Sequence, residues 1–181
     1  MSIDGRDLKF PKYVWEAPVR IWHWVMALAM VVLCVTGYFI GAPLPSVPGE
    51  AIDNYLMGYI RFAHFAAGYV FAVVLLMRAY WAIVGNPFSR EMFLVPVFVF
   101  RPSWWRSFFR VLGHYLFIRR ENDWHYGHNQ LAMAAMFGMY LLGSLFMVVT
   151  GFALYGEGTG MGTWQHAWFS SWVIPLFGQS Q

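Results

Sequence analysis

The chain has 181 residues, of which 12 are Lys or Arg and 9 are Asp or Glu, so its formal net charge is +3. Apolar residues make up 59% and aromatic residues 20% of the chain, whereas apolar residues make up about 45–50% of ordinary soluble domains. So few charges cannot cover so much apolar surface in water. The composition therefore excludes a disordered chain, disfavours a water-soluble enzyme and predicts an all-α membrane protein.

Three long apolar segments, residues 21–40, 60–84 and 131–155, are predicted to cross the bilayer. A helix rises about 1.5 Å per residue, so each segment is long enough to span about 30 Å of hydrocarbon. The first is too long for the apolar part of a secretory signal and ends in Gly41-Ala42-Pro43, which favours an uncleaved span. We expect an antiparallel transmembrane helix bundle.

The segment between the second and third spans has a different pattern. Pro87, Pro96 and Pro102 break any continuous helix there. Residues 103–120 then combine an aromatic and apolar stripe with a basic stripe, both at helical spacing; the basic stripe consists of Arg106, Arg110 and His114. This pattern is typical of a helix that lies in the membrane interface. A loop helix packed on protein is the alternative.

The basic residues predict the topology. Eleven of the 12 Lys and Arg residues lie in 1–20, in 85–130 or at the adjoining end of the second span, and the outer exception is Arg61. The positive-inside rule therefore places 1–20 and 85–130 in the cytoplasm, and 41–59 and 156–181 on the periplasmic side. The basic residues thus line a membrane face, and no nucleic-acid partner is expected.

Two of the six histidines, His23 and His64, lie inside predicted spans. An ionisable residue in a span is by default a functional hypothesis. Neutral imidazole binds iron, and two imidazoles on one haem make a centre that passes electrons. Ala27 and Gly68, each one turn along, are small enough to let a porphyrin approach. The alternative is that each histidine only hydrogen-bonds a neighbouring helix.

The antiparallel arrangement separates these histidines. His23 is expected toward the cytoplasm and His64 toward the outside, and across about 30 Å they cannot hold one haem. Two haems would each need a second histidine. The candidates in the chain are His125 or His128 inside and His166 outside, and a fourth helix with two histidines would serve both haems.

The single cysteine, Cys34, excludes other redox centres. One thiol cannot close an internal disulfide, hold a Cys-ligated iron–sulfur cluster or supply the C-x-x-C-H motif of a c-type haem.

Four stretches carry a family resemblance: Tyr13–Trp24 (YVWEAPVRIWHW), Val35–Ala51 (VTGYFIGAPLPSVPGEA), Met57–Glu91 and Gly127–Glu157. In this order they resemble the cytochrome b subunit of membrane-bound uptake nickel–iron hydrogenases. The resemblance implies a multi-pass protein of the bacterial inner membrane with four transmembrane helices and two b-type haems. It also implies electron transfer to membrane quinone from a periplasmic hydrogenase with a large nickel–iron subunit and a small iron–sulfur subunit. With one cysteine this chain cannot bind a nickel–iron centre, so it is expected to be a redox subunit that does not itself act on hydrogen.

The resemblance also implies site residues. Two haem ligands of the family map onto His23 and His64, and the other two belong to a fourth helix with no counterpart up to Gln181. The quinone head group is expected near His128 and Asn129, where Asn129 would donate a hydrogen bond and His128 would exchange a proton. Asn129 could also cap the third span, and both roles are compatible.

The outer segments carry two further hypotheses. Pro43–Asp53 and an aromatic tail are expected to help dock the periplasmic partner; the tail's aromatic residues are Trp164, Trp168, Phe169, Trp172 and Phe177. Such aromatics also suit an interfacial belt. Arg61 is expected either to pair with a haem propionate or to extend to the lipid headgroups.

Three alternative functions stay open. One is the cytochrome b of another dehydrogenase, such as formate dehydrogenase, and another is a haem-free membrane anchor of a periplasmic complex. A transporter is disfavoured because no span carries charged residues at its midplane.

Overall fold

The computed structural model describes residues 15–45, 55–119 and 128–177, and these parts are almost entirely helical, with no strand among them. The first two long helices are α1 (Ala17–Gly41) and α2 (Leu56–Val84). A third combines α6 (Gln130–Ala135), the π-helical η4 (Met136–Leu142) and α7 (Gly143–Thr159). All three are long and apolar enough to cross a membrane. The prediction of an all-α membrane protein is confirmed.

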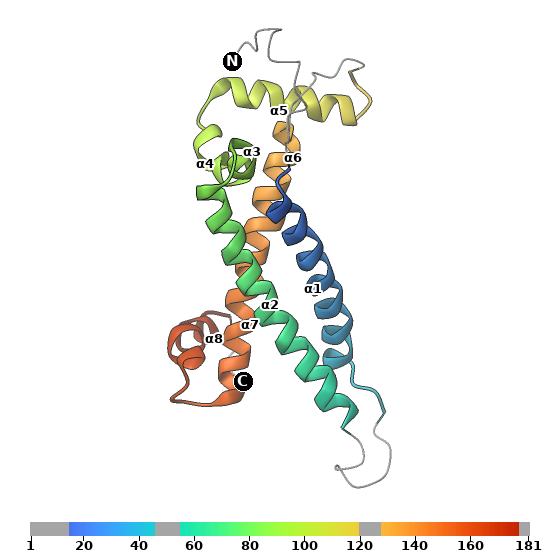
Figure 1. The fold of residues 1–181 in the computed structure, drawn as a ribbon, viewed down its shortest axis with the longest axis vertical. Coiled ribbons are helices and arrows are strands. Elements are labelled where there is room, and N and C mark those ends of the chain that lie inside the picture. Colours follow the sequence, from blue (N-terminus) through green and yellow to red (C-terminus); the bar gives the residue numbers. More distant parts are fainter. Residues whose placement is uncertain (1–14, 46–54, 120–127, 178–181) are drawn as a thin grey trace.

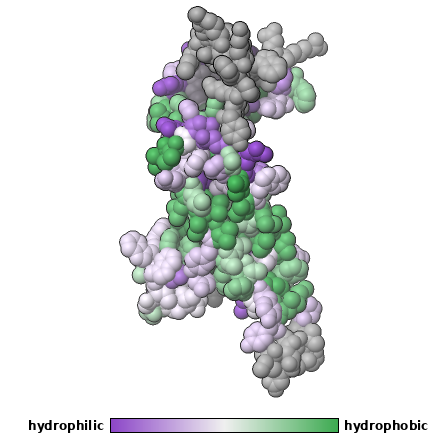
Figure 2. Space-filling model, viewed as in Figure 1, coloured by the Kyte–Doolittle hydropathy of each residue, from purple (hydrophilic) through white to green (hydrophobic). Residues whose placement is uncertain are grey.

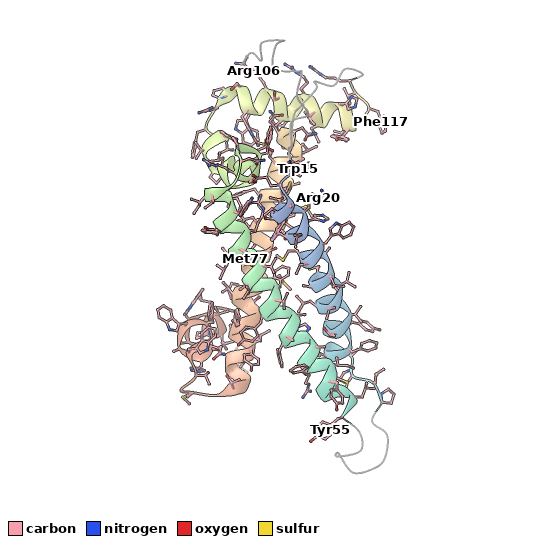
Figure 3. The ribbon with its side chains drawn as sticks, in the orientation of Figure 1. Trp15, Arg20, Tyr55, Met77, Arg106 and Phe117 are labelled. Atoms are coloured by element: carbon pink, nitrogen blue, oxygen red, sulfur yellow. The ribbon has the colours of Figure 1, made fainter. Side chains whose placement is uncertain are left out.

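The three long helices form an elongated bundle (Figure 1). α1 and α2 are antiparallel and make the most extensive contact between helices, and α7 packs against α2. Each observed helix extends beyond the corresponding predicted span, 21–40, 60–84 or 131–155, by one to four residues at one or both ends. Arg20 and Arg106 lie toward one end of the molecule, whereas Tyr55 lies at the opposite end (Figure 3).

A small core holds the bundle together. Met26 and Ala29 of α1 are buried against Phe71 and Leu75 of α2, and Tyr140 of η4 packs on this cluster. Much of the remaining helix surface is apolar and exposed. On the face drawn in Figure 2, hydrophobic residues cover the middle of the bundle and the most hydrophilic residues lie toward one end. This distribution matches a chain whose middle contacts hydrocarbon.

Short helices connect the second and third long helices. They are α3 (Pro87–Arg90), the 3₁₀ helix η3 (Glu91–Leu94), α4 (Val95–Phe98) and α5 (Pro102–Tyr115). Each of the three prolines lies in the first turn of a helix, where its missing N–H is not needed. The prolines therefore divide this segment as expected.

α5 lies across the end of the bundle (Figure 1). Trp104 is buried against Val95 and Met133, whereas Arg106 and Phe109 are exposed. The two interpretations of the 103–120 pattern therefore apply to different faces of one helix. One face packs on protein, and the other remains available to the membrane interface.

The segment after α7 folds back on it as η5 (His166–Ser170, π-helical) and α8 (Ser171–Phe177). A Cβ at Gly156 would lie only 2.5 Å from Ser170 Oγ and 2.7 Å from the His166 nitrogen, so glycine permits this close approach. The Ser170 hydroxyl donates to the Ala153 carbonyl over 2.6 Å. The aromatic tail is thus a packed hairpin whose outward-facing side chains are held in place.

Candidate functional site

His64 is partly buried on α2 and faces α1. Its Nδ1 lies 2.8 Å from the hydroxyl oxygen of Thr36. The Thr36 hydroxyl donates its single proton to the Val32 carbonyl over 2.6 Å, so it acts as acceptor toward His64. This network assigns the imidazole proton to Nδ1 and leaves Nε2 with a free lone pair, the form in which a histidine binds a metal.

Gly37 is the small residue that lies against the His64 ring. A Cβ built there would be 3.4 Å from His64 Cε1 and 3.9 Å from Nδ1. At Gly68, which we expected to make room for a porphyrin, a Cβ would meet a Leu33 methyl at 4.0 Å. The close approach of α1 to His64 therefore depends on Thr36 and Gly37. Both residues lie in Val35–Ala51, one of the stretches that carry the family resemblance.

His23 is exposed on α1 and packs edge-on against the neighbouring Trp24 ring, with centroids 5.5 Å apart. It does not approach His64. His64 lies opposite Thr36, 13 residues after His23, which corresponds to roughly 20 Å along the helix axis. The two histidines therefore occupy separate places, as expected for ligands of two different groups.

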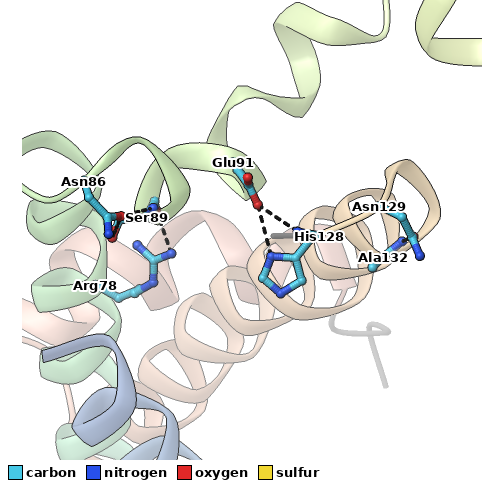
Figure 4. A network of polar contacts seen from close by, with 7 residues as sticks. All are labelled: Arg78, Asn86, Ser89, Glu91, His128, Asn129 and Ala132. Carbon is cyan, nitrogen blue, oxygen red and sulfur yellow. Dashed lines mark hydrogen bonds and ion pairs between the residues drawn. The ribbon is translucent and has the colours of Figure 1, made fainter. Parts of the chain in front are cut away.

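His128 and Asn129 precede α6, and each has a defined partner. The backbone N–H and Nδ1 of His128 both lie 3.2 Å from one carboxylate oxygen of Glu91 (Figure 4), and the His128 ring packs against Trp15 at 4.6 Å. Asn129 Oδ1 accepts a hydrogen bond from the Ala132 nitrogen over 2.8 Å. The helix-capping role of Asn129 is confirmed, and capping leaves its side-chain NH₂ free to donate elsewhere.

A second network joins the start of α1 to the end of α2. One carboxylate oxygen of Glu16 accepts hydrogen bonds from Trp81 Nε1 (2.8 Å), the Asn86 nitrogen (3.1 Å) and the Ser89 hydroxyl (3.4 Å). These bonds, that from the Asn86 backbone above all, lower the pKa of Glu16. Asn86 also caps α3 by accepting from the Ser89 nitrogen. Glu16 is thus held ionised at the point where α1, α2 and α3 meet.

Arg78 lies beside this network and is 4% exposed. Its Nη2 donates to the Ser89 carbonyl over 2.7 Å (Figure 4), and its guanidinium lies over the rings of Trp22 and Phe93. The sequence analysis used Arg78 only in the count of basic residues that predicts the topology. A charged residue within an apolar span is also a sign of a functional site, and this sign pointed to Arg78. Glu91, the partner of His128, carried no such signal.

The remaining histidine candidates, His166 and His125, are not shown close to His23 or His64. His166 begins η5, where its backbone N–H donates to Thr163 Oγ1 over 3.3 Å. His125 lies outside the described residues, as does most of Pro43–Asp53. Arg61 is exposed on α2, as either of its expected roles requires.

Several known proteins are similar to this chain. The model of a family described as "Prokaryotic cytochrome b561" matches residues 14–178. A "Probable Ni/Fe-hydrogenase B-type cytochrome subunit" of Azotobacter chroococcum is 61% identical over 169 residues, which are 93% of this chain and 69% of the relative. A protein of the same name from Cupriavidus necator is 55% identical over 177 residues, covering 98% and 71%. The "Probable Ni/Fe-hydrogenase 1 B-type cytochrome subunit" of Escherichia coli K12 is 60% identical over 145 residues, covering 80% and 60%.

Proposed function

Since this chain belongs to the prokaryotic cytochrome b561 family, we propose that it is the electron-transfer subunit of a membrane-bound nickel–iron hydrogenase. In this role it passes electrons from the periplasmic hydrogenase through b haems to membrane quinone, and it anchors the enzyme in the inner membrane. The hydrogenase-subunit names of its close relatives support this proposal.

The hydrogen bond from His64 to Thr36 is the observation that carries the haem assignment. It leaves Nε2 of His64 as the unprotonated nitrogen inside an apolar span. When bound, a bis-histidine b haem exchanges single electrons without an open coordination position. His64 would hold one haem and His23 another, about 20 Å away along α1. The second ligand of each is expected from a fourth helix, as the family resemblance implies.

The chain is proposed to lie with its amino-terminal end in the cytoplasm. Arg20 and Arg106 lie toward the same end of the bundle (Figure 3), and the positive-inside rule makes that end cytoplasmic. His23, near the start of α1, then serves the inner haem, and His64, near the start of α2, serves the outer one. Electrons that arrive on the periplasmic side reach His64 first.

The quinone head group is proposed to bind at the cytoplasmic end, near His128 and Asn129. Quinone reduction consumes protons as well as electrons, so it needs a group that delivers protons. Glu91 holds the His128 ring through Nδ1, which leaves Nε2 to face a substrate. The NH₂ group of Asn129 is available to a quinone carbonyl because the cap uses only Oδ1.

The periplasmic face is proposed to contact the hydrogenase through the aromatic tail, which consists of η5, α8 and the residues just before them. Trp164, Trp168 and Trp172 recur every four residues and are 52%, 73% and 49% exposed. Exposed tryptophans on a packed support are frequent anchors at protein interfaces. The small iron–sulfur subunit is the expected contact, with the large nickel–iron subunit beyond it.

Haem content tests the proposed function. We expect two b haems per polypeptide in the protein isolated with its complex, measured by reduced difference spectrum and pyridine haemochrome. His23→Ala and His64→Ala should each lose one haem, whereas the matched control His114→Ala, on α5, should retain both. A haem-free wild-type protein would refute the electron-transfer role and indicate a membrane anchor.

A further inference from the structure

A group of polar atoms without partners lies inside the helix bundle, apart from His64 and His128. Arg78 is 4% exposed, and its only hydrogen bond to a described residue runs from Nη2 to the Ser89 carbonyl. Its Nε and Nη1 are buried and have no hydrogen-bond partner among the described residues. No described carboxylate pairs with it. A guanidinium in such a place is costly, because burial removes water and only one hydrogen bond and two aromatic rings, those of Trp22 and Phe93, offset the charge.

Two further polar atoms lie in the same place. Trp22 Nε1 and the Tyr140 hydroxyl are also buried without a partner in the described structure. The Arg78 guanidinium carbon lies 5.2 Å from the centre of the Trp22 ring. The Trp22 and Tyr140 rings meet edge-on, with centroids 5.3 Å apart. Three helical segments, α1, α2 and η4, thus bring together three side chains that each carry a buried polar atom without a partner.

These groups cannot satisfy one another. Arginine and tryptophan side chains only donate hydrogen bonds, and the hydroxyl oxygen of Tyr140, the one group here that can also accept, has no hydrogen-bond partner among the described residues. The cluster therefore contains more donors than acceptors. The positive charge favours an anionic acceptor over a neutral one, because in a low dielectric the opposite charge contributes most.

The nearby carboxylates serve other groups. One oxygen of Glu16 accepts hydrogen bonds from Trp81, Asn86 and Ser89, and one oxygen of Glu91 pairs with His128. Neither carboxylate forms a hydrogen bond with the unpaired atoms of the cluster, so we look for the acceptor outside these residues. Tyr140 belongs to the π-helical turn Met136–Leu142, and such turns within α-helices occur frequently at functional sites.

We propose that Trp22, Arg78 and Tyr140 form a buried oxyanion-binding site between α1, α2 and η4. Its ligand presents carboxylate or phosphate oxygens within the membrane-spanning part of the bundle. Two sources supply them: a haem propionate or a phospholipid phosphate. Trp22 directly precedes His23, so a haem held by His23 lies at the same depth; this source rests on the proposed function.

The test uses the protein isolated in its complex and compares three variants. Arg78→Gln removes the charge, and Tyr140→Phe removes only a hydroxyl. Arg90→Gln is the matched control, because Arg90 is exposed and donates only to the carbonyls of Ile83 and Gly85. The readouts are the midpoint potential of each haem by redox titration and the tightly bound phospholipid per polypeptide by native mass spectrometry.

A propionate ligand predicts that Arg78→Gln lowers the midpoint potential of one haem, because a lost positive charge favours the ferric form. The change should be about tenfold in that haem's reduction equilibrium, typical of a lost charged hydrogen bond. A phosphate ligand predicts unchanged potentials and the loss of one bound phospholipid. In either case Tyr140→Phe gives a smaller effect in the same readout.

The site would be refuted if both variants retained their haem and matched Arg90→Gln in potential and in bound lipid. If Arg78→Gln does not fold, Tyr140→Phe alone tests the site through the same two readouts. A haem-free wild-type protein would refute the proposed function instead, and the lipid readout would then decide the site alone.

Discussion

The hydroxyl of Thr36 on α1 accepts a hydrogen bond from Nδ1 of His64 on α2 over 2.8 Å. This contact joins two helices in the apolar part of the bundle and orients the imidazole at the same time. A metal-binding histidine depends on such a partner, and loss of the partner typically costs 10- to 100-fold in metal affinity or activity.

Thr36→Val should therefore weaken the haem proposed at His64. Valine keeps the shape of threonine but removes the acceptor, so Nδ1–H is left unpaired and the imidazole becomes a weaker donor to iron. We expect a higher midpoint potential and lower occupancy of one haem, with recovery in Thr36→Ser. Redox titration and pyridine haemochrome measure both quantities.

Thr150→Val is the control for this substitution, because the Thr150 hydroxyl is exposed and bonds only carbonyls of its own helix, those of Phe146 and Met147. Equal effects of the two substitutions would contradict a specific role of Thr36.

Gly37→Val should displace the His64 ring. A Cβ there would already contact His64 Cε1 at 3.4 Å, and valine adds two methyl groups beyond that contact. Overpacking of this kind typically costs about 1–3 kcal/mol, and we expect loss of one of the two haems. Gly151→Val is the matched variant, because no atom lies within 4 Å of a Cβ there. Retention of both haems in Gly37→Val would show that His64 does not need this approach.

Glu91→Gln should slow quinone reduction with little change in haem content. The substitution removes the charge that holds the His128 ring at 3.2 Å, so His128 would no longer be oriented for proton transfer. General acid–base groups contribute about 10²–10⁴-fold, and loss of orientation should cost roughly tenfold of this. The rate is measured as hydrogen-dependent quinol formation.

The corresponding control is Glu157→Gln, at the opposite end of the third long helix. A Glu91→Gln enzyme with the wild-type rate and pH profile would exclude His128 from proton delivery.

Glu16 should make stability depend on pH in the acid range. Its hydrogen bonds with Asn86, Trp81 and Ser89 lower its pKa from the ordinary 4.5. A carboxyl with a lowered folded-state pKa stabilises the protein above the unfolded value, and this contribution is lost as the pH falls through the folded value. Thermal unfolding in detergent should show a lower Tm for Glu16→Gln than for wild type at pH 7. The two values should converge as the pH falls below 4.5; a pH-independent difference would argue against an ionised Glu16.

The double variant Trp168→Ser, Trp172→Ser should release the hydrogenase. Both side chains are exposed, at 73% and 49%, so the hairpin itself should remain packed through Gly156 and Ser170. Buried tryptophan anchors at interfaces contribute about 2 kcal/mol or more, so we expect binding of the hydrogenase to weaken by about thirtyfold or more. Trp105→Ser, exposed on α5, is the comparison. Full co-purification of the double variant would assign these tryptophans to the lipid interface.

The three spans, the capping by Asn129 and the intramembrane histidines were all predictable from the sequence. Each is a local property: apolar length decides whether a segment crosses a bilayer, and an Asn before a helix caps it through its own backbone. The family resemblance was also visible in the sequence, because it rests on the order of residues along the chain.

The contacts between helices were decided only by the tertiary structure. Each of these contacts joins segments that are far apart in the chain. They are the contacts of Thr36 with His64, of Glu91 with His128, and of Arg78 with Trp22 and Tyr140. The neighbours of Gly68 and Gly37 were decided in the same way, since a Cβ at Gly68 would meet Leu33 and a Cβ at Gly37 would meet His64. Hydropathy is nearly uniform around these helices, so it does not set their rotation. That rotation follows from how small and large side chains interlock between neighbouring helices.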